Sequence, residues 1–396
     1  MPSICCTTDV SRPNLVRRLG IALVCVVLIL SSGCRMFATR TKARVENLVR
    51  SGRYVAAERE IRRWLKLAPH DTAVLALDIR LMANERKLSE AIRTYQRWYA
   101  VARTHSRELL MEIVRAGIKD HDERVSMQAL RTCGEFDLAE AYQDVIEATR
   151  SRRPWIRSEA YLALGRSSNP EATFMLFFGF WDDDNRVRAH ALEAAGKRRD
   201  TLSLRWSRAC VLDPDPEVQW REAVTRTELG DLRELHWIIQ GLKEGDIYAV
   251  DAAACLAEIG RREYLSVLDR LLSSDEPMAR YLAARNLGEL KAREYLSDVI
   301  ELTRDTCDRV REGVADGLGK MGDTTALSTL AELAGDRDYD TRAAAAISVA
   351  RLRTTETESR LMKLLSDTCN VVRVSAIGSL AGLLPPPPVS ESVAAP

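Results

Sequence analysis

Residues typical of strands, of the turns between strands and of metal sites are scarce in this sequence. Its 396 residues include only six Phe and 20 Gly, which disfavours a strand-rich fold. The five histidines are scattered, without other ligands at a recognisable metal-site spacing. His121, between Asp120 and Asp122, comes closest to a cluster, but such a polar turn favours a solvated loop over a ligand. We therefore expect no catalytic residue, no metal and no other cofactor.

Charge of one sign is also lacking. The chain has 58 basic and 57 acidic side chains, a net charge of +1. Without the segment 1–34 the balance is 55 basic to 56 acidic. Nucleic-acid-binding proteins concentrate basic charge, so we expect no nucleic-acid partner. We expect no small-molecule substrate either.

The N-terminus, residues 1–34, has the form of a secretory signal. Two arginines precede a ten-residue apolar stretch, and small residues follow it. The stretch is too short for an ordinary membrane-spanning helix, which needs about 20 apolar residues. The small residues end in Cys34 and resemble the lipobox of bacterial lipoproteins, although Ser31 stands where Leu is usual. The resemblance implies that Cys34 is lipidated; the alternative is a plain signal or uncleaved anchor in which Cys34 is incidental.

One helical pattern recurs with a 31-residue period along the segment 105–384. Each copy has a β-branched or small anchor residue, often followed by Arg, with a small apolar pair four and five positions later. The nine anchors are Val125, Ile156, Val187, Val218, Tyr248, Ala279, Val310, Thr341 and Val372. Such a period predicts a solenoid of helix pairs, in which the second helix of each unit begins at the anchor. If each unit adds about 10 Å, nine units form a curved rod on the order of 90 Å long.

The phrase that begins at Val310, Val-Arg-Glu-Gly-Val-Ala-Asp-Gly-Leu-Gly, resembles the HEAT repeat in the short form of phycobilin-lyase-like proteins. The resemblance extends to all nine units and implies an all-α, right-handed α-solenoid. It also implies a ladder between the Arg after the anchor and acidic residues of adjacent turns. Six units carry this arginine, as Arg157, Arg188, Arg280, Arg311, Arg342 and Arg373. Ser126, Gln219 and Ala249 replace it, so the ladder should be interrupted at the first, fourth and fifth units.

The segment 35–104 follows a different, 34-residue period, in which Trp64 aligns with Trp98. The part 52–69 resembles the second half of a tetratricopeptide repeat, which implies two such helix pairs. The second copy departs from that family because Arg86 replaces a turn glycine, and a generic pair of helical hairpins predicts nearly the same structure. Two repeats are fewer than the three usually needed for stability. We therefore expect these helices to dock on the array as its N-terminal cap.

Nine cysteines suggest disulfides in an exported protein, but their placement argues against pairing. Five lie beyond residue 34, at Cys133, Cys210, Cys255, Cys307 and Cys369. The last two occupy equivalent positions two units apart. At about 10 Å a unit they lie well beyond the Cα separation of about 7 Å that a disulfide spans. We expect single buried or turn thiols.

Aromatic residues gather in units two to five, and residues 174–181 are apolar nearly all round. A helix without a polar face is either fully covered or meets a partner. One interpretation is an unusually bulky core, and the other is a protein-binding segment. If the second helices line the concave face, its exposed positions should include an aromatic-plus-Arg set typical of interfaces. The candidate partner-binding residues are Trp220, Arg221, Tyr281, Arg285, Phe177 and Trp181.

The expected organisation is a signal (1–34), a tetratricopeptide-like cap (35–104), a HEAT-like array (105–384) and a disordered Pro-rich tail (385–396). It favours a non-enzymatic protein-interaction scaffold, lipid-anchored in the bacterial cell envelope and facing the periplasm. The alternative is a lyase-like or other accessory enzyme built on a HEAT solenoid. HEAT-like deoxyhypusine hydroxylases carry repeated His-Glu pairs for iron, and this chain contains no such pair. HEAT-like DNA glycosylases need a basic groove, and the nearly equal numbers of basic and acidic residues argue against one here.

The anchor is tested by replacement of one residue. We expect Cys34→Ser to release the chain from the membrane fraction, because a thioether-linked lipid cannot form on a serine. The measurement is the distribution between membrane and soluble fractions after cell lysis. A Cys34→Ser protein that stays in the membrane fraction would contradict lipidation at this residue.

Overall fold

The computed structural model describes residues 42–199 and 201–387, and these residues form helices without any strand. The all-α fold class is therefore confirmed. The predicted signal, Cys34 and residues 388–396 of the predicted tail lie outside the described residues. Within the described residues, no helix is both long and apolar enough to cross a membrane.

Each of the nine predicted units contains a second helix with the anchor at its third residue. These helices are α6 (Glu123–Glu135), α8 (Pro154–Arg166), α10 (Asn185–Arg198), α12 (Pro216–Glu228), α14 (Asp246–Glu258), α16 (Pro277–Glu289), α18 (Asp308–Met321), α20 (Tyr339–Leu352) and α22 (Asn370–Leu383). Asp122, Asp184, Asp215 and Asp338 precede four of them and accept hydrogen bonds from backbone N–H groups of the first turn. The register read from the 31-residue period is thus confirmed.

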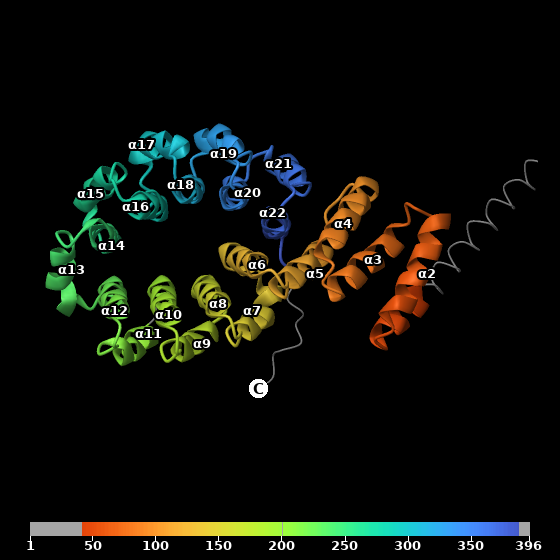
Figure 1. Ribbon diagram of the computed structural model, residues 1–396, viewed down its shortest axis with the longest axis horizontal. Coiled ribbons are helices and arrows are strands. Elements are labelled where there is room, and N and C mark those ends of the chain that lie inside the picture. The colour runs from red at the N-terminus through yellow and green to blue at the C-terminus, as the bar shows by residue number, and fades with distance from the viewer. Residues whose placement is uncertain (1–41, 200, 388–396) are drawn as a thin grey trace, which may run out of the picture.

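The first helices of the units form an outer layer around the second helices (Figure 1). They are α5 (Arg107–Ile118), α7 (Tyr142–Ala148), α9 (Ala172–Gly179), α11 (Thr201–Trp206), α13 (Leu235–Gly241), α15 (Leu265–Leu271), α17 (Leu296–Glu301), α19 (Leu327–Leu333) and α21 (Thr357–Leu364). Short 3₁₀ segments lead into or extend several of them. The second helices line the concave side, as predicted.

The arginine after the anchor forms the predicted ladder. In Arg157, Arg188, Arg280, Arg311 and Arg342 the guanidinium donates two hydrogen bonds to the carboxylate of an aspartate 25 residues later, at 2.6–3.0 Å. The same guanidinium donates a third bond to the carbonyl six residues earlier. The carbonyl and the aspartate occupy equivalent positions of consecutive units, so each rung joins two neighbouring turns. The bonds to aspartate are charge-assisted and bidentate, the strongest kind.

The predicted interruptions are found where arginine is missing. Gln219 makes no ion pair but keeps the carbonyl bond, through Nε2 to Asp213 O at 2.6 Å. Ser126 likewise donates to Asp120 O at 3.0 Å. The guanidinium of the sixth arginine, Arg373, donates to Ser89 O at 3.0 Å. The ladder therefore ends in a bond to the N-terminal cap.

The array closes into a ring, so the prediction of a curved rod is wrong. Helix α22 packs against α5 and α6 of the first unit (Figure 1), and apolar residues of the first and ninth units share one core. The Arg107 guanidinium donates to the carbonyls of Ala381 and Leu384 across this seam, both at 2.6 Å. Small residues allow the close approach, because a Cβ at Gly378 would overlap the side chain of Thr132. The two end units thus cover each other's apolar faces.

Residues 42–102 form the cap and extend from the ring at the seam. The helical residues 42–50 precede α2 (Tyr54–Leu67), α3 (Thr72–Asn84) and α4 (Leu88–Ala102). Docking on the array is confirmed, since α3 and α4 pack on α5. Helix α4 also reaches the last unit, where Tyr99 donates to Glu358 at 2.5 Å. The helical pairs fit both a tetratricopeptide-like unit and a generic hairpin, so that resemblance stays a prediction.

A ladder arginine should contribute far more stability than a surface one. Arg311 and its partner Asp336 are both largely buried, and removal of one member of a buried pair costs about 3–5 kcal/mol. We expect Arg311→Ala to lower the free energy of unfolding by about 3 kcal/mol at pH 7. Burial raises the pKa of Asp336, but hydrogen bonds from Arg311 and the backbone outweigh it and lower that pKa below its ordinary value. The stabilisation is therefore present above about pH 4 and is lost as the pH falls through the lowered pKa.

The matched control is Arg337→Ala, because Arg337 pairs with Asp308 on the exposed surface at 3.0 Å. An exposed pair contributes about 0–1 kcal/mol. Denaturant unfolding of both variants at pH 7 and pH 3 gives the comparison. Equal losses for Arg311→Ala and Arg337→Ala at pH 7 would contradict a structural role for the ladder.

A bulky residue at the seam should open the ring. We expect Gly378→Leu to increase the radius of gyration measured by small-angle X-ray scattering, because the added side chain collides with Thr132 of α6. Gly335→Leu is the control, since Gly335 lies at an exposed helix end, with only the Glu332 carbonyl near. Unchanged scattering and unchanged thermal unfolding of Gly378→Leu would show that the seam does not hold the ring closed.

Candidate functional site

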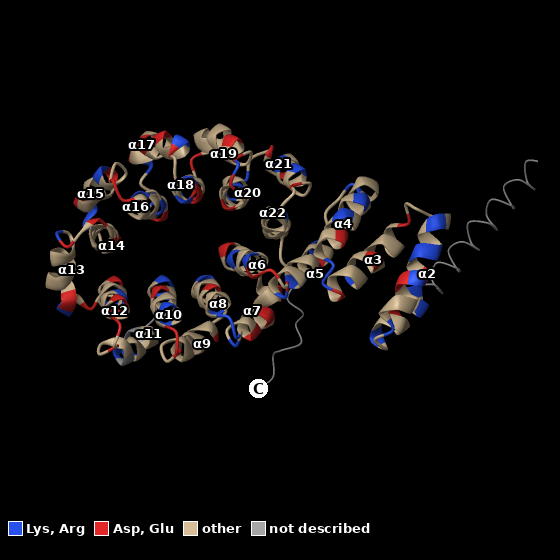
Figure 2. Ribbon diagram, viewed as in Figure 1, with Lys and Arg blue, Asp and Glu red and all other residues tan. Residues whose placement is uncertain are grey.

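The space inside the ring is crossed by ion pairs between opposite sides. Arg131 of α6 contacts Glu159 of α8 at 3.4 Å and Glu312 of α18 at 3.1 Å. Arg166 of α8 contacts Glu135 at 3.4 Å and reaches Glu289 of α16 at 3.6 Å. Units one and two are thereby joined to units six and seven. In Figure 2 the inner helices carry acidic and basic residues side by side.

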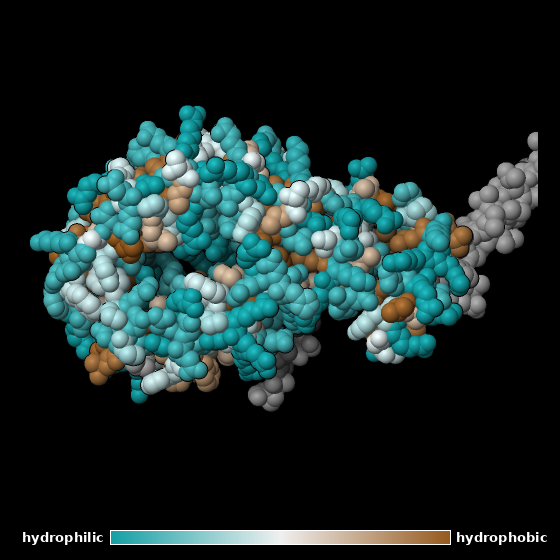
Figure 3. All heavy atoms as spheres, in the orientation of Figure 1, coloured by the Kyte–Doolittle hydropathy of each residue, from teal (hydrophilic) through white to brown (hydrophobic). Residues whose placement is uncertain are grey.

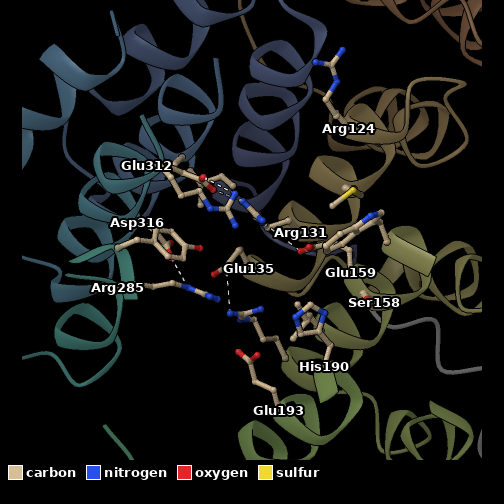
Figure 4. Close-up of a pocket in the computed structure, with 18 of the residues that line it drawn as sticks. Arg124, Arg131, Glu135, Ser158, Glu159, His190, Glu193, Arg285, Glu312 and Asp316 are labelled. Atoms are coloured by element: carbon tan, nitrogen blue, oxygen red, sulfur yellow. Dashed lines mark hydrogen bonds and ion pairs between the residues drawn. The ribbon is translucent and has the colours of Figure 1, made fainter. Parts of the chain in front are cut away.

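A cavity of about 430 Å³, lined by charged and apolar side chains, lies among these pairs, in the size range of small-molecule sites. Helices α6, α8 and α10 supply one side of its wall, and α16, α18 and α20 the other. The space-filling view shows a hollow inside the ring (Figure 3). In Figure 4, Arg285 and Glu193 extend into the same space from α16 and α10. Ring closure is what brings the two sides of this cavity together.

Most charged groups of the wall neutralise one another, but one corner is left without partners. Ser158 is 2% exposed, and its Oγ has no hydrogen-bond partner. The Nδ1 of His190 is likewise buried and unpartnered. Glu193, one helical turn after His190, makes no ion pair or hydrogen bond with the described residues, and Arg285 contacts Asp316 through Nε alone, at 3.2 Å. Buried polar groups normally have partners, so this corner is the exceptional part of the wall.

The electrostatic environment fixes the charge states of this corner. Burial raises the pKa of Glu193, but the nearby Arg285 and Arg221 outweigh it and bring that pKa to about 2. Burial lowers the pKa of His190 below its ordinary value. At neutral pH the corner therefore holds an anionic carboxylate, a neutral imidazole and a hydroxyl, opposite a guanidinium.

A charged residue at one fixed position of the repeat marks these inward-facing residues in the sequence. The tenth residue after the anchor is charged in eight of nine units: Glu135, Arg166, Lys197, Glu228, Glu258, Glu289, Lys320 and Arg351. Five of them are joined by ion pairs, including Lys320 to Glu289 at 2.6 Å and Arg351 to Glu135. Charged residues that recur at one position of a helical repeat normally indicate a solvent-exposed face. Here the ring is closed, so these side chains lie inside it and pair with one another.

Trp220 and Tyr281, two of the predicted partner-binding residues, are buried, so the prediction that they are exposed is wrong. Trp220 is 4% exposed and packs edge-on against Trp237 and Tyr248, with ring centroids 5.5 and 5.2 Å apart. Its Nε1 donates to Asp251 at 3.1 Å, and Arg221 contacts the same carboxylate at 2.8 Å. Trp220 belongs to a core between units four and five, where the ladder is interrupted, and Trp237 packs against that core.

Tyr281 and Arg285 lie in the wall of the cavity. Tyr281 is 6% exposed, and the Arg309 guanidinium sits over its ring at 4.7 Å from the centroid. The structure therefore separates the four predicted concave residues into two pairs. Trp220 and Arg221 stabilise the array, whereas Tyr281 and Arg285 face the enclosed space.

An exposed aromatic surface lies on the outer helix α9 and the turn that follows it, and we call it the α9 surface. Phe174 and Phe178 of α9 are 58% and 61% exposed, and Trp181 in the turn is 64% exposed. Phe177, from the predicted set, is partly buried and packs against Trp206 at 5.3 Å between ring centroids. The bulky-core interpretation holds for Leu176 and Phe180, which are buried, but not for these three.

Basic residues are concentrated at the N-terminal end, although the whole chain is balanced. All Lys and Arg residues between 42 and 67 are exposed, and we call them the basic surface: Lys42, Arg44, Arg50, Arg53, Arg59, Arg62, Arg63 and Lys66. The same range holds three acidic residues. Figure 2 shows this concentration on α2, at the end of the molecule away from the ring. The net charge of the whole chain does not reveal this excess of basic residues at the N-terminal end.

The cysteines behave as predicted for unpaired thiols. Cys133, Cys210 and Cys255 are buried, and Cys307 and Cys369 stand directly before α18 and α22. Burial raises the pKa of the Cys210 thiol to about 12, which suppresses the reactive thiolate. In the described ranges, no three His, Cys, Asp or Glu side chains are placed to hold a metal ion.

Comparison with known proteins identifies HEAT repeats in two stretches. The family described as HEAT repeats matches residues 109–196 and 264–350. The unmatched stretch between them contains Gln219 and Ala249, where the ladder is broken. No curated protein matches the chain.

Solved structures with similar folds include human deoxyhypusine hydroxylase in complex with glycerol, at 19% identity over 70% of this chain and 96% of that one, with a TM-score of 0.36. The complex of CpcE and CpcF of phycocyanin lyase from Nostoc is 15% identical over 71% and 96% of the two chains, with a TM-score of 0.36. YibA of Escherichia coli is 16% identical over 64% and 94%, with a TM-score of 0.31. Similarities this low carry no inference about function.

Proposed function

We propose that this chain is a non-enzymatic protein-interaction scaffold, anchored by lipid at Cys34 in the bacterial cell envelope and facing the periplasm. The observation that carries the proposal is the α9 surface. Three large aromatic side chains on one exposed helix end are costly to leave in water. Exposed aromatic clusters are enriched in protein interfaces, where a few such residues supply most of the binding energy.

The closed ring supports an outward-facing partner surface. In open solenoids the concave side offers an extended surface for partners. Here ion pairs such as Arg131–Glu312 and Arg166–Glu289 cross the enclosed space, so a folded partner cannot enter without breaking them. The outer helices are the surface that stays accessible, and α9 presents its aromatic residues there.

The basic surface supports the membrane tether. It begins shortly after Cys34 in the sequence, and Arg50, Arg53, Arg59, Arg63 and Lys66 have no acidic partner among the described residues. A single lipid chain binds membranes only marginally, and an adjacent polybasic segment supplies the second attraction. On this proposal the tetratricopeptide-like cap lies between the membrane and the ring and holds the α9 surface away from the lipid.

The partner surface is tested by affinity capture from membranes. We expect Phe178→Ser combined with Trp181→Ser to reduce recovery of co-purifying proteins at least about tenfold, because interface aromatics commonly contribute about 2 kcal/mol or more each. Both side chains are mostly exposed, so the fold should tolerate the changes.

The matched control is Leu232→Ser combined with Met278→Ser, which removes two exposed apolar residues elsewhere on the array. Circular dichroism of both double variants checks that they remain helical. Retention of every captured protein by the Phe178/Trp181 variant would refute the α9 surface as the partner site.

A further inference from the structure

The enclosed cavity contains a corner whose polar groups lack partners. Ser158 of α8 and His190 and Glu193 of α10 all line it, and Arg285 faces them from α16. Ser158 Oγ and His190 Nδ1 are buried without hydrogen bonds, and Glu193 has no ion-pair partner among the described residues. A buried polar atom without a partner costs about 1–3 kcal/mol, and more when it is charged. Something polar is therefore required at this corner.

The rest of the wall shows that the corner is not simply an unpaired part of a charged surface. Arg131 is held by Glu159 and Glu312, and Arg166 by Glu135 and Glu289. The remaining arginines of the wall also have acidic partners, as in Arg309 with Glu312 at 3.1 Å. These groups neutralise each other and are not available to a ligand without loss of a pair. In the part of the chain that the structure describes, the charged groups of this wall without such contacts are Glu123, at the first residue of α6, Glu193 and the Nη groups of Arg285. Of these, Glu193 is the carboxylate that lies one helical turn from His190.

The chemistry of the free groups defines the ligand. The Glu193 carboxylate accepts hydrogen bonds from an ammonium group, and the Ser158 hydroxyl and the His190 ring nitrogen supply two further hydrogen-bonding positions beside it. The Nη groups of Arg285 donate to a carboxylate. A volume of about 430 Å³ fits a small molecule and not a folded protein segment.

We propose that the cavity inside the ring binds a small zwitterion, with its ammonium group on Glu193, Ser158 and His190 and its carboxylate on Arg285. The ligand completes the hydrogen bonding of the corner and adds a link between α10 and α16, on opposite sides of the ring. This inference does not depend on the lipid anchor or on the α9 surface.

The test is isothermal titration calorimetry of the full-length protein with the ω-amino acids from glycine to 6-aminohexanoate. This series keeps both charges and varies only the distance between them. We expect binding at one or more chain lengths, and much weaker binding of ethylammonium and of acetate, each of which carries one of the two charges. Absence of heat for every member of the series would overturn the proposal, as would equal affinity for ethylammonium.

Two variants locate the site. We expect Glu193→Gln to weaken binding of the best ω-amino acid about tenfold or more, because a charge-assisted hydrogen bond is lost. We expect Arg285→Gln to have a similar effect, with thermal unfolding as a check because Arg285 also contacts Asp316. Glu332→Gln, at an exposed position on α19, is the matched control and should bind as the wild type does. Unchanged affinity in Glu193→Gln would exclude this corner as the site even if Arg285→Gln fails to fold.

Discussion

The burial of apolar surface between the first and ninth units governs the rest of this structure. Units of an array cover each other's apolar faces, and an open array must cap both ends. Here α22 packs on α5 and α6, so each end unit serves as the cap of the other. Glycines at the seam are required for the approach, as at Gly378 against Thr132. From this contact follow the enclosed cavity, the inward position of the charged register and the place where the N-terminal helices attach.

The arginine ladder complements the seam because it sets how neighbouring units stack. Each rung ties a guanidinium to an aspartate of the next turn and to a carbonyl of its own, which fixes their relative orientation. The ladder fails at Gln219 and Ala249, on either side of the one shortened step between anchors, from Val218 to Tyr248. In that region ring contacts of the buried Trp220 with Trp237 and Tyr248 replace it. Packing of large rings is less dependent on one geometry than bidentate pairing, so this part of the ring can accommodate the irregular step.

Local features of the fold followed from the sequence, and long-range ones did not. The anchors, the capping aspartates and the ladder with its interruptions all depend on residues within about one repeat, and the period revealed them. Ring closure depends on the total curvature of the array, which is the sum of small rotations between nine successive units. No sequence motif predicts that total curvature. The burial of Trp220 and Tyr281 has a different cause. Side chains of the next unit cover them, Trp237 and Tyr248 in the first case and Arg309 in the second, although their helical register is that of a concave face.

Closure of the ring also changes which surfaces are accessible to binding partners. An open solenoid offers its concave side to macromolecular partners, whereas this ring fills that side with paired charges, and the one unpaired corner is small. On the scaffold proposal, a protein partner binds the outer side of the ring, where Phe174, Phe178 and Trp181 lie exposed. The proposed zwitterion has the opposite preference, because Glu193 and Arg285 inside the ring match its two charges and are partly shielded from water. On these two proposals the seam places the two kinds of binding on different faces of the ring.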